Sequence, residues 1–147
     1  MFGKNSRPIF DTNIFTSYRK HLEKKDFHRM SFSIVVLYEL IARPIPQPQF
    51  DEFDEWRENY KDLDRLIVPT YDDIWTSAQA VRKLRLAQQK LHKGITPPME
   101  NATKFQNDAV IARSAFANNC FLVTANTKDF DELRKFMRFD YCSAQDY

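Results

Sequence analysis

The sequence predicts an α/β domain with a three-layer α/β/α architecture, in which helices cover both faces of a central parallel sheet of about five short strands. Short β-rich runs alternate along the chain with segments whose apolar residues recur every three or four positions. Acidic residues stand where several of these runs end. Such alternation is typical of parallel strands joined by helices, and the strand ends of such a sheet share one edge.

The composition agrees with a single domain over residues 1–147. The chain is 43% hydrophobic and 29% charged, which suits a globular protein with a substantial core. No apolar run is long enough to predict a membrane span or the core of a signal peptide. Two cysteines are too few for a disulfide framework, so we expect a reducing cytoplasm. A net charge of +2 does not by itself indicate a nucleic-acid binder.

The expected strands are short, and most are followed by a helix. The segment 30–40 is ambiguous, because Ile34 and its neighbours favour a strand whereas Ser31 or Ser33 could cap a helix. We expect a strand that ends near Ser33 and then a buried helix that carries Glu39. The other predicted strands are 7–10, 65–69, 120–124 and 139–142, and the other predicted helices are 11–22, 49–63, 72–93, 107–118 and 129–136.

The apolar spacing also predicts which helix faces are buried. In the helix that begins at Asp72 or Asp73, we expect the buried side to be Ile74, Ala78, Val81, Leu84 and Leu91. Gly94 is a natural residue for the end of this helix. Its basic residues could form a modest nucleic-acid track, but a charged helix face is more often simply solvated.

Three acids and one polar turn are candidates for a site, and each also has a simpler interpretation. Asp11 could be a helix cap, and Asp108 could be an acid in the first turn of its helix. Glu39 must reach a cleft or a partner such as Arg43, because glutamate is rarely buried unpaired. Asn126 and Asp129 flank a turn, where both residue types are common.

Taken together, these residues predict a metal site. Clustered carboxylates repel one another unless a cation neutralises them, and hard oxygen ligands suit Mg²⁺ or Mn²⁺. The histidines are scattered on polar segments, so we expect them at the surface. The chain contains two glycines, which excludes a glycine-rich phosphate-binding loop.

Four motifs in this order resemble those of PIN-domain ribonucleases, in particular the VapC-like toxins of type II toxin–antitoxin systems. They are IFDTN at 9–13, Ser33 with YEL at 38–40, NDAVIA at 107–112, and LVTANTKDF at 122–130. The resemblance extends from Ile9 to about Tyr141. It implies a PIN-like fold with an acidic pocket at the carboxyl edge of the sheet.

The resemblance also implies the site residues. Asp11, Glu39 and Asp108 would be catalytic residues that bind divalent metal. The fourth acid of the family falls at Asn126 or at Asp129, and we favour Asp129, acting through water. The supporting or substrate-orienting residues would be Thr12, Asn13, Ser33, Thr124 and Asn126.

The function that follows from the resemblance is a Mg²⁺-dependent endoribonuclease, with Mn²⁺ as a possible substitute, that hydrolyses RNA phosphodiester bonds. A homodimer and a small antitoxin protein are the expected partners. The alternatives are a catalytically silent PIN-like module that binds RNA or serves as a scaffold, and a PIN nuclease in RNA processing without an antitoxin. A phospho-acceptor receiver domain is set aside, because the run that ends at Thr70 lacks an acceptor aspartate.

Overall fold

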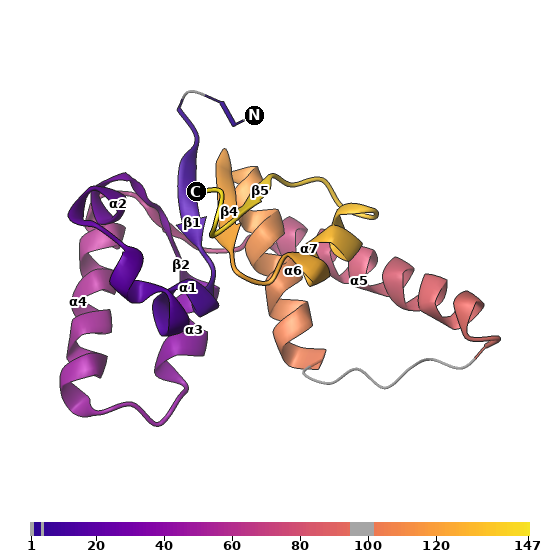
Figure 1. Cartoon of the computed structure of the whole chain (residues 1–147), viewed down its shortest axis with the longest axis horizontal. Helices are drawn as coiled ribbons and strands as arrows, with labels where there is room; N and C mark the ends of the chain where they lie inside the picture. The colour runs from indigo at the N-terminus through magenta and orange to yellow at the C-terminus, as the bar shows by residue number, and fades with distance from the viewer. Residues whose placement is uncertain (1, 4, 95–101) are drawn as a thin grey trace.

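The computed structural model describes residues 2–3, 5–94 and 102–147, in which five strands alternate with helices (Figure 1). The strands are β1 (Arg7–Phe10), β2 (Phe32–Ser33), β3 (Leu66–Ile67), β4 (Cys120–Thr124) and β5 (Tyr141–Ser143). The helices are α1 (Thr12–Ser17), the 3-10 helix η1 (Arg19–His21), α2 (Lys24–Arg29), α3 (Ile34–Ile41), α4 (Gln47–Asp62), α5 (Tyr71–Leu91), α6 (Ala102–Ala117) and α7 (Thr127–Arg134).

All strand pairs are parallel, as predicted, but they do not form one sheet of five strands. A three-stranded sheet has the order β1-β4-β5, and β2 pairs with β3. One bridge between Ile9 and Ser31 connects the two sheets. The connection is short because β2 ends at Ser33, whose hydroxyl accepts the Val35 N–H at 3.2 Å and begins α3.

Helices lie on both sides of the strands, as expected for the α/β/α class. Figure 1 shows α1 to α4 on one side and α5 to α7 on the other. All five residues of β4 are buried, which is typical of a central strand covered on both faces. Ala109 and Ala112 of α6 are fully buried, since their small side chains allow α6 to pack closely against the core. In the described part of the chain, no helix is long and apolar enough to cross a membrane.

The first predicted helix, 11–22, is wrong in its length. Helix α1 ends at Ser17, and the lysine-rich segment HLEKKDFHR at 21–29, which was expected to close the first helix, contains α2 after the short η1. A capping box starts α2, because the Asp26 carboxylate accepts the Glu23 N–H at 2.8 Å. Asp26 is buried and also accepts a hydrogen bond from the Tyr147 hydroxyl at 3.1 Å. The contact with a residue far along the chain therefore favours a new helix here.

The predicted buried face of α5 is confirmed at Leu84 and is wrong at both ends of the helix. Ile74 is 49% exposed and Leu91 is 81% exposed, whereas α5 buries Asp73, Ser77, Ala80 and Leu84. Polar contacts with α6 explain the difference. The Ser77 hydroxyl donates to the Ala109 carbonyl at 3.1 Å, and Arg113 lies 3.3 Å from the Asp73 carboxylate. Hydrophobic spacing could not predict a helix face that is buried through polar groups.

Helix α6 begins at Ala102 rather than near Asn107. Asp108 therefore lies inside the helix, and its interpretation as a first-turn acid is wrong. The loop predicted at 96–101 lies outside the described residues. The helix expected at 49–63 is confirmed as α4, and Gly94, just beyond α5, has a positive φ of 89°.

Candidate functional site

The candidate site lies at the carboxyl edge of the three-stranded sheet. Strands β1 and β4 run in parallel with Phe10 opposite Val123, so Asp11 and Thr124 come next to each other. The Asp11 N–H continues the sheet by donating to the Val123 carbonyl at 2.9 Å. The side chains of Asp11 and Thr124 are both fully buried. The strand register thus places a carboxylate and a hydroxyl in direct contact.

Asp11 is a helix cap and also the centre of a hydrogen-bond network. Its Oδ1 accepts the Thr12 N–H at 2.7 Å, which caps α1. Its Oδ2 accepts the Asn13 amide at 3.0 Å and the Thr124 hydroxyl at 2.7 Å. Asn13 also accepts the Ala125 N–H at 3.1 Å, which joins the start of α1 to the loop after β4. These donors hold the Asp11 carboxylate in one orientation.

Glu39 projects from α3 and is held from two sides by neutral groups. The Thr12 hydroxyl donates to Glu39 Oε2, and the side-chain amide of Asn107 donates to Glu39 Oε1 at 3.0 Å. Arg43, the partner proposed from the sequence, is exposed, and no ion pair with it is seen among the described residues. Thr12 therefore connects Asp11 and Glu39, because its N–H binds one carboxylate and its hydroxyl the other.

Asp108, the third predicted acid, lies within α6. It follows Asn107 in the sequence, and its side chain is fully buried. The bond between Asn107 and Glu39 therefore brings the part of α6 that carries Asp108 against α3. Three elements supply the three predicted acids: the β1–α1 junction supplies Asp11, α3 supplies Glu39, and α6 supplies Asp108.

The polar turn after β4 connects to the same network. The Asn126 N–H donates to the Thr124 hydroxyl oxygen at 3.0 Å, and its side-chain amide donates to Asp129 Oδ2 at 2.8 Å. Asp129 is half-buried. It reaches Asp11 through Asn126 and Thr124, so the structure places it at the edge of the network.

Ser33, one of the predicted supporting residues, has a structural contact of its own. It is fully buried, and its hydroxyl caps α3. It bears on the site by fixing the start of the helix that carries Glu39. Asn107 was absent from the predicted site residues. Its position directly before Asp108 could have indicated a role in the site. Its partner, however, lies on another helix, 68 residues earlier in the chain.

The donor chemistry of these residues fits a hard divalent cation. The candidate ligands are all carboxylates, and their partners are hydroxyl and amide groups. The three histidines are exposed, as predicted. Among the described residues, no three His, Cys, Asp or Glu side chains are arranged closely enough to hold a metal ion. The residues therefore fit a divalent cation by the chemistry of their oxygen donors and not by the spacing of their side chains.

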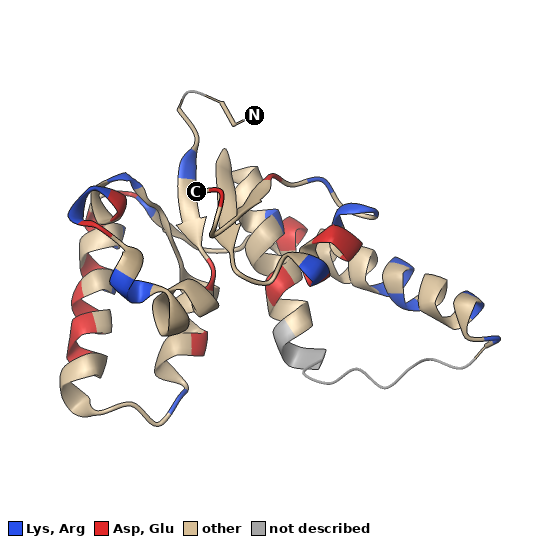
Figure 2. Ribbon diagram, viewed as in Figure 1, with Lys and Arg blue, Asp and Glu red and all other residues tan. Residues whose placement is uncertain are grey.

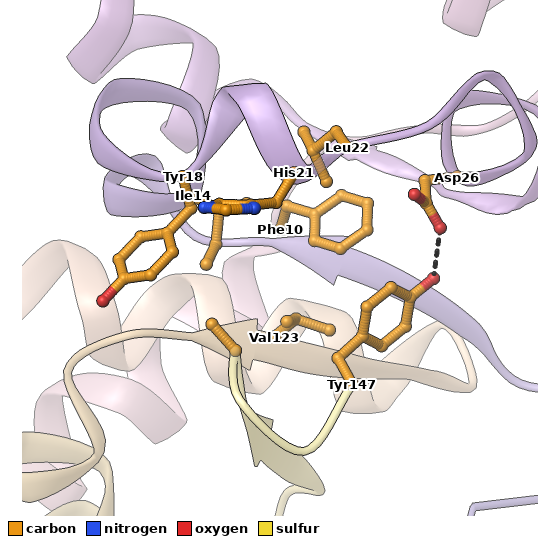
Figure 3. Close-up of a pocket in the computed structure, with 9 residues that line it drawn as sticks. Phe10, Ile14, Tyr18, His21, Leu22, Asp26, Val123 and Tyr147 are labelled. Carbon is orange, nitrogen blue, oxygen red and sulfur yellow. Dashed lines mark hydrogen bonds between the residues drawn. The ribbon is translucent and has the colours of Figure 1, made fainter.

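A separate pocket of about 330 Å³ lies between α1, the start of α2 and the end of the chain (Figure 3). Phe10, Ile14 and Leu22 give it an apolar lining, and the Tyr147 hydroxyl donates to Asp26 at its rim. Burial and the nearby Asp26 carboxylate raise the pKa of Tyr147 to about 12. None of the four predicted catalytic acids lines this pocket.

Comparison with known proteins identifies the fold. No protein-family model matches the chain, and no curated protein matches it in sequence. VapBC2 from Rickettsia felis, solved bound to a DNA fragment from its promoter, aligns over 92% of this chain and 97% of the matched chain, with 21% identity and a TM-score of 0.52. DNA-bound VapBC from Salmonella typhimurium aligns over 94% and 98%, with 18% identity and a TM-score of 0.54.

The chain has the PIN fold. The resemblance seen in the four sequence motifs is thus confirmed at the level of the fold. In this PIN fold, the carboxyl edge of the sheet carries Asp11 and Thr124, helix α3 brings Glu39 to Thr12, and α6 carries Asp108 directly after Asn107, the partner of Glu39.

Proposed function

We propose that this PIN-fold chain is a metal-dependent endoribonuclease that hydrolyses RNA phosphodiester bonds. The observation that carries the proposal is the hydrogen-bond network that joins Asp11 to Glu39 through Thr12 and joins Glu39 to the residue before Asp108. A helix cap needs only the Asp11 carboxylate and the Thr12 N–H. Capping therefore does not account for the contacts of Thr12 and Asn107 with Glu39. The network suits a site whose carboxylates must keep defined orientations.

In this proposal, Asp11, Glu39 and Asp108 hold Mg²⁺ or Mn²⁺, and Asp129 contributes through water. When bound, a divalent cation activates water and stabilises negative charge at the phosphate. Asn13 and Thr124 hold the Asp11 carboxylate, and Asn126 holds Asp129. Thr12 and Asn13, at the start of α1, also orient the substrate.

We further propose that the chain is the toxin of a toxin–antitoxin pair, acting in the cytoplasm as a homodimer. The support is the fold shared with the two VapBC structures. Its partner would be a small antitoxin protein that holds the nuclease inactive.

The direct test is cleavage of RNA with Mg²⁺ or Mn²⁺ by the wild type and by the Asp11→Asn and Asp108→Asn variants. Both variants keep the side-chain shape and remove one charge, so we expect folded proteins that have lost cleavage. Asp62→Asn, an exposed residue at the end of α4, is the control for loss of one charge and should cleave as the wild type does. Calorimetric titration with Mn²⁺ should show weaker binding in the two site variants. Equal cleavage by wild type and both site variants would contradict the proposal.

The toxin assignment is tested in cells. Expression of the chain alone should stop growth, and co-expression of a small neighbouring gene should restore it. Harmless expression of soluble, active protein would indicate an RNA-processing nuclease. RNA binding without metal-dependent cleavage would indicate a catalytically silent module.

A further inference from the structure

Two adjoining grooves follow α5 toward the candidate site. The first, of about 530 Å³, lies between α5 and α6 and reaches Asn107, the partner of Glu39. The second, of about 470 Å³, lies along α5. Ala78 and Arg82 line both, so the two grooves form one continuous surface. The surface is also lined by Trp75, Gln79, Lys83, Val81 and Val110.

One face of α5 carries an aromatic ring followed by cations. Gln79, Arg82 and Lys83 stand four, seven and eight positions after Trp75, so all share one side of the helix. At 1.5 Å per residue, Trp75 and Lys83 are separated by about 12 Å along the axis. Trp75 is 57% exposed, although it is among the largest apolar side chains of the protein. Ile74, which precedes it and lines the first groove, is also exposed, and adjoining exposed apolar side chains are one mark of an interaction site.

The second half of α5 carries positive charges that no nearby acidic residue of the same helix offsets. From Arg82 to Leu91 the helix contains four basic residues and no acidic residue. Figure 2 shows blue segments and no red segment along this end of α5, whereas red segments recur along α4. No carboxylate among the described residues forms an ion pair with Arg82 or Lys83. Both cations remain available to a negatively charged ligand.

We propose that this surface binds single-stranded RNA and leads it to the candidate site. A base stacks on Trp75, phosphates contact Arg82 and Lys83, and the strand passes Val81 and Val110 toward Asn107. Cations beside an exposed aromatic ring are the usual means of binding single-stranded nucleic acid without regard to sequence. We call this surface, from Lys83 to Asn107, the RNA track. That its ligand is RNA and that it ends at the candidate site both rest on the proposed nuclease function.

Charge favours RNA over a second copy of the chain as the occupant. In a two-fold symmetric dimer centred on this surface, Arg82 and Lys83 of one copy would lie close to the same cations of the other near the symmetry axis. This repulsion would be uncompensated, because neither cation has a carboxylate partner among the described residues. A polyanion removes the repulsion.

The test measures binding of a short, fluorescently labelled single-stranded RNA of mixed sequence, with EDTA present so that metal-dependent cleavage does not occur. Trp75→Ala should weaken binding about tenfold or more, whereas Trp75→Phe should retain much of it, because phenylalanine keeps a stacking surface. Arg82→Gln and Lys83→Gln should each weaken binding and lower the salt dependence, by about 0.7 in the slope of log K against log salt per lost contact. RNA should quench the tryptophan fluorescence of the wild type much more than that of Trp75→Phe.

Two matched controls lie on the same side of α5 but beyond the residues that line the grooves, one turn before Trp75 and two turns after Lys83. Tyr71→Ala removes an aromatic ring that is 78% exposed, and Lys90→Gln removes one positive charge. Tyr71→Ala should bind RNA as the wild type does, and Lys90→Gln should lose much less than Arg82→Gln. Equal losses from Lys90→Gln and Arg82→Gln would overturn the proposal, since the attraction would then come from general charge.

The outcomes separate this proposal from the nuclease function. If the wild type cleaves RNA and the α5 variants bind RNA unchanged, the track is wrong while the nuclease function stands. If the wild type does not cleave but the α5 variants lose affinity, the track stands without the nuclease. If Trp75→Ala changes the mass in sedimentation and leaves RNA affinity unchanged, the surface is an interface between copies and the proposal is wrong.

Discussion

Asn107 of α6 donates a hydrogen bond to Glu39 of α3, with 3.0 Å between Nδ2 and Oε1. This contact makes the orientation of Glu39 depend on where α6 lies. Helix α6 is in turn held by α5, through the bond from Ser77 to the Ala109 carbonyl and the ion pair of Asp73 with Arg113. The candidate site thus depends on contacts some distance from its carboxylates.

The first prediction concerns the Asn107 amide. Replacing Asn107 with Ala should lower metal-dependent RNA cleavage about 10- to 100-fold, the usual cost of removing a group that orients a metal ligand. The protein should remain folded, because Asn107 is only half-buried. Asn59→Ala, an exposed amide on α4, is the control and should leave cleavage unchanged. Cleavage by Asn107→Ala at the wild-type rate would show that this contact does not position Glu39 for catalysis.

The second prediction concerns Thr124 and Asp11, which are buried and 2.7 Å apart. Thr124→Val keeps the shape and removes the hydroxyl, so we expect the free energy of unfolding to fall by about 1.5–3 kcal/mol, the range for hydrogen bonds to charged groups. Thr124→Ser keeps the hydroxyl and should lose less. Urea denaturation measures both variants.

The same substitutions in an Asp11→Ala background isolate the contact between the two side chains. Thr124 also accepts hydrogen bonds from Asn13 and Asn126. Part of the loss in unfolding free energy caused by Thr124→Val will therefore remain in that background. The cost of Thr124→Val should nevertheless be smaller without Asp11. An unchanged cost would mean that the Thr124 hydroxyl stabilises the loop after β4 and contributes nothing through Asp11.

The third prediction concerns Asp73, whose carboxylate accepts the Thr70 N–H at 2.9 Å and pairs with Arg113 at 3.3 Å. Asp73 is 1% exposed. Asp73→Ala should lower the free energy of unfolding by about 3–5 kcal/mol, because it leaves a partly buried arginine without its partner. The neighbouring Asp72 is exposed in the same helical turn, and Asp72→Ala should cost far less. Similar losses for the two variants would exclude a special role for the buried pair.

The fourth prediction concerns alkaline pH. Burial raises the pKa of Tyr60, whose hydroxyl donates to the Phe27 carbonyl at 2.7 Å, to about 12. Tyr147 is raised to about 12 by burial and by Asp26. An unfolded tyrosine ionises near pH 10. The folded state therefore retains protons that the unfolded state has lost, and stability should fall as the pH rises from about 10 to about 12.

Chemical denaturation at a series of pH values measures this fall. Tyr60→Phe should be less stable than the wild type at neutral pH and should show a shallower fall above pH 10. Tyr71→Phe removes a tyrosine that is 78% exposed, and its pH profile should match that of the wild type. An equally steep fall in Tyr60→Phe would exclude Tyr60 as a source of the alkaline sensitivity.

The sequence by itself determined much of the local structure. The strands at 7–10 and 120–124 and the helix that carries Glu39 lie where they were predicted. Each depends on short-range properties: β-branched and aromatic residues in the strands, and a serine that caps the next helix. Asp11 was recognised as a cap for the same reason, since its partner is the next residue in the chain.

Only the tertiary structure decided how these elements meet. The buried face of α5, the position of Asp108 within α6, the split of the five strands into two sheets and the partners of Glu39 all differ from the prediction or go beyond it. The buried face of α5 and the partners of Glu39 depend on polar groups that are distant in the sequence and become neighbours on folding. Hydrophobic spacing and local propensity contain no information about such partners, because a hydrogen bond between α3 and α6 leaves no periodic trace in either helix.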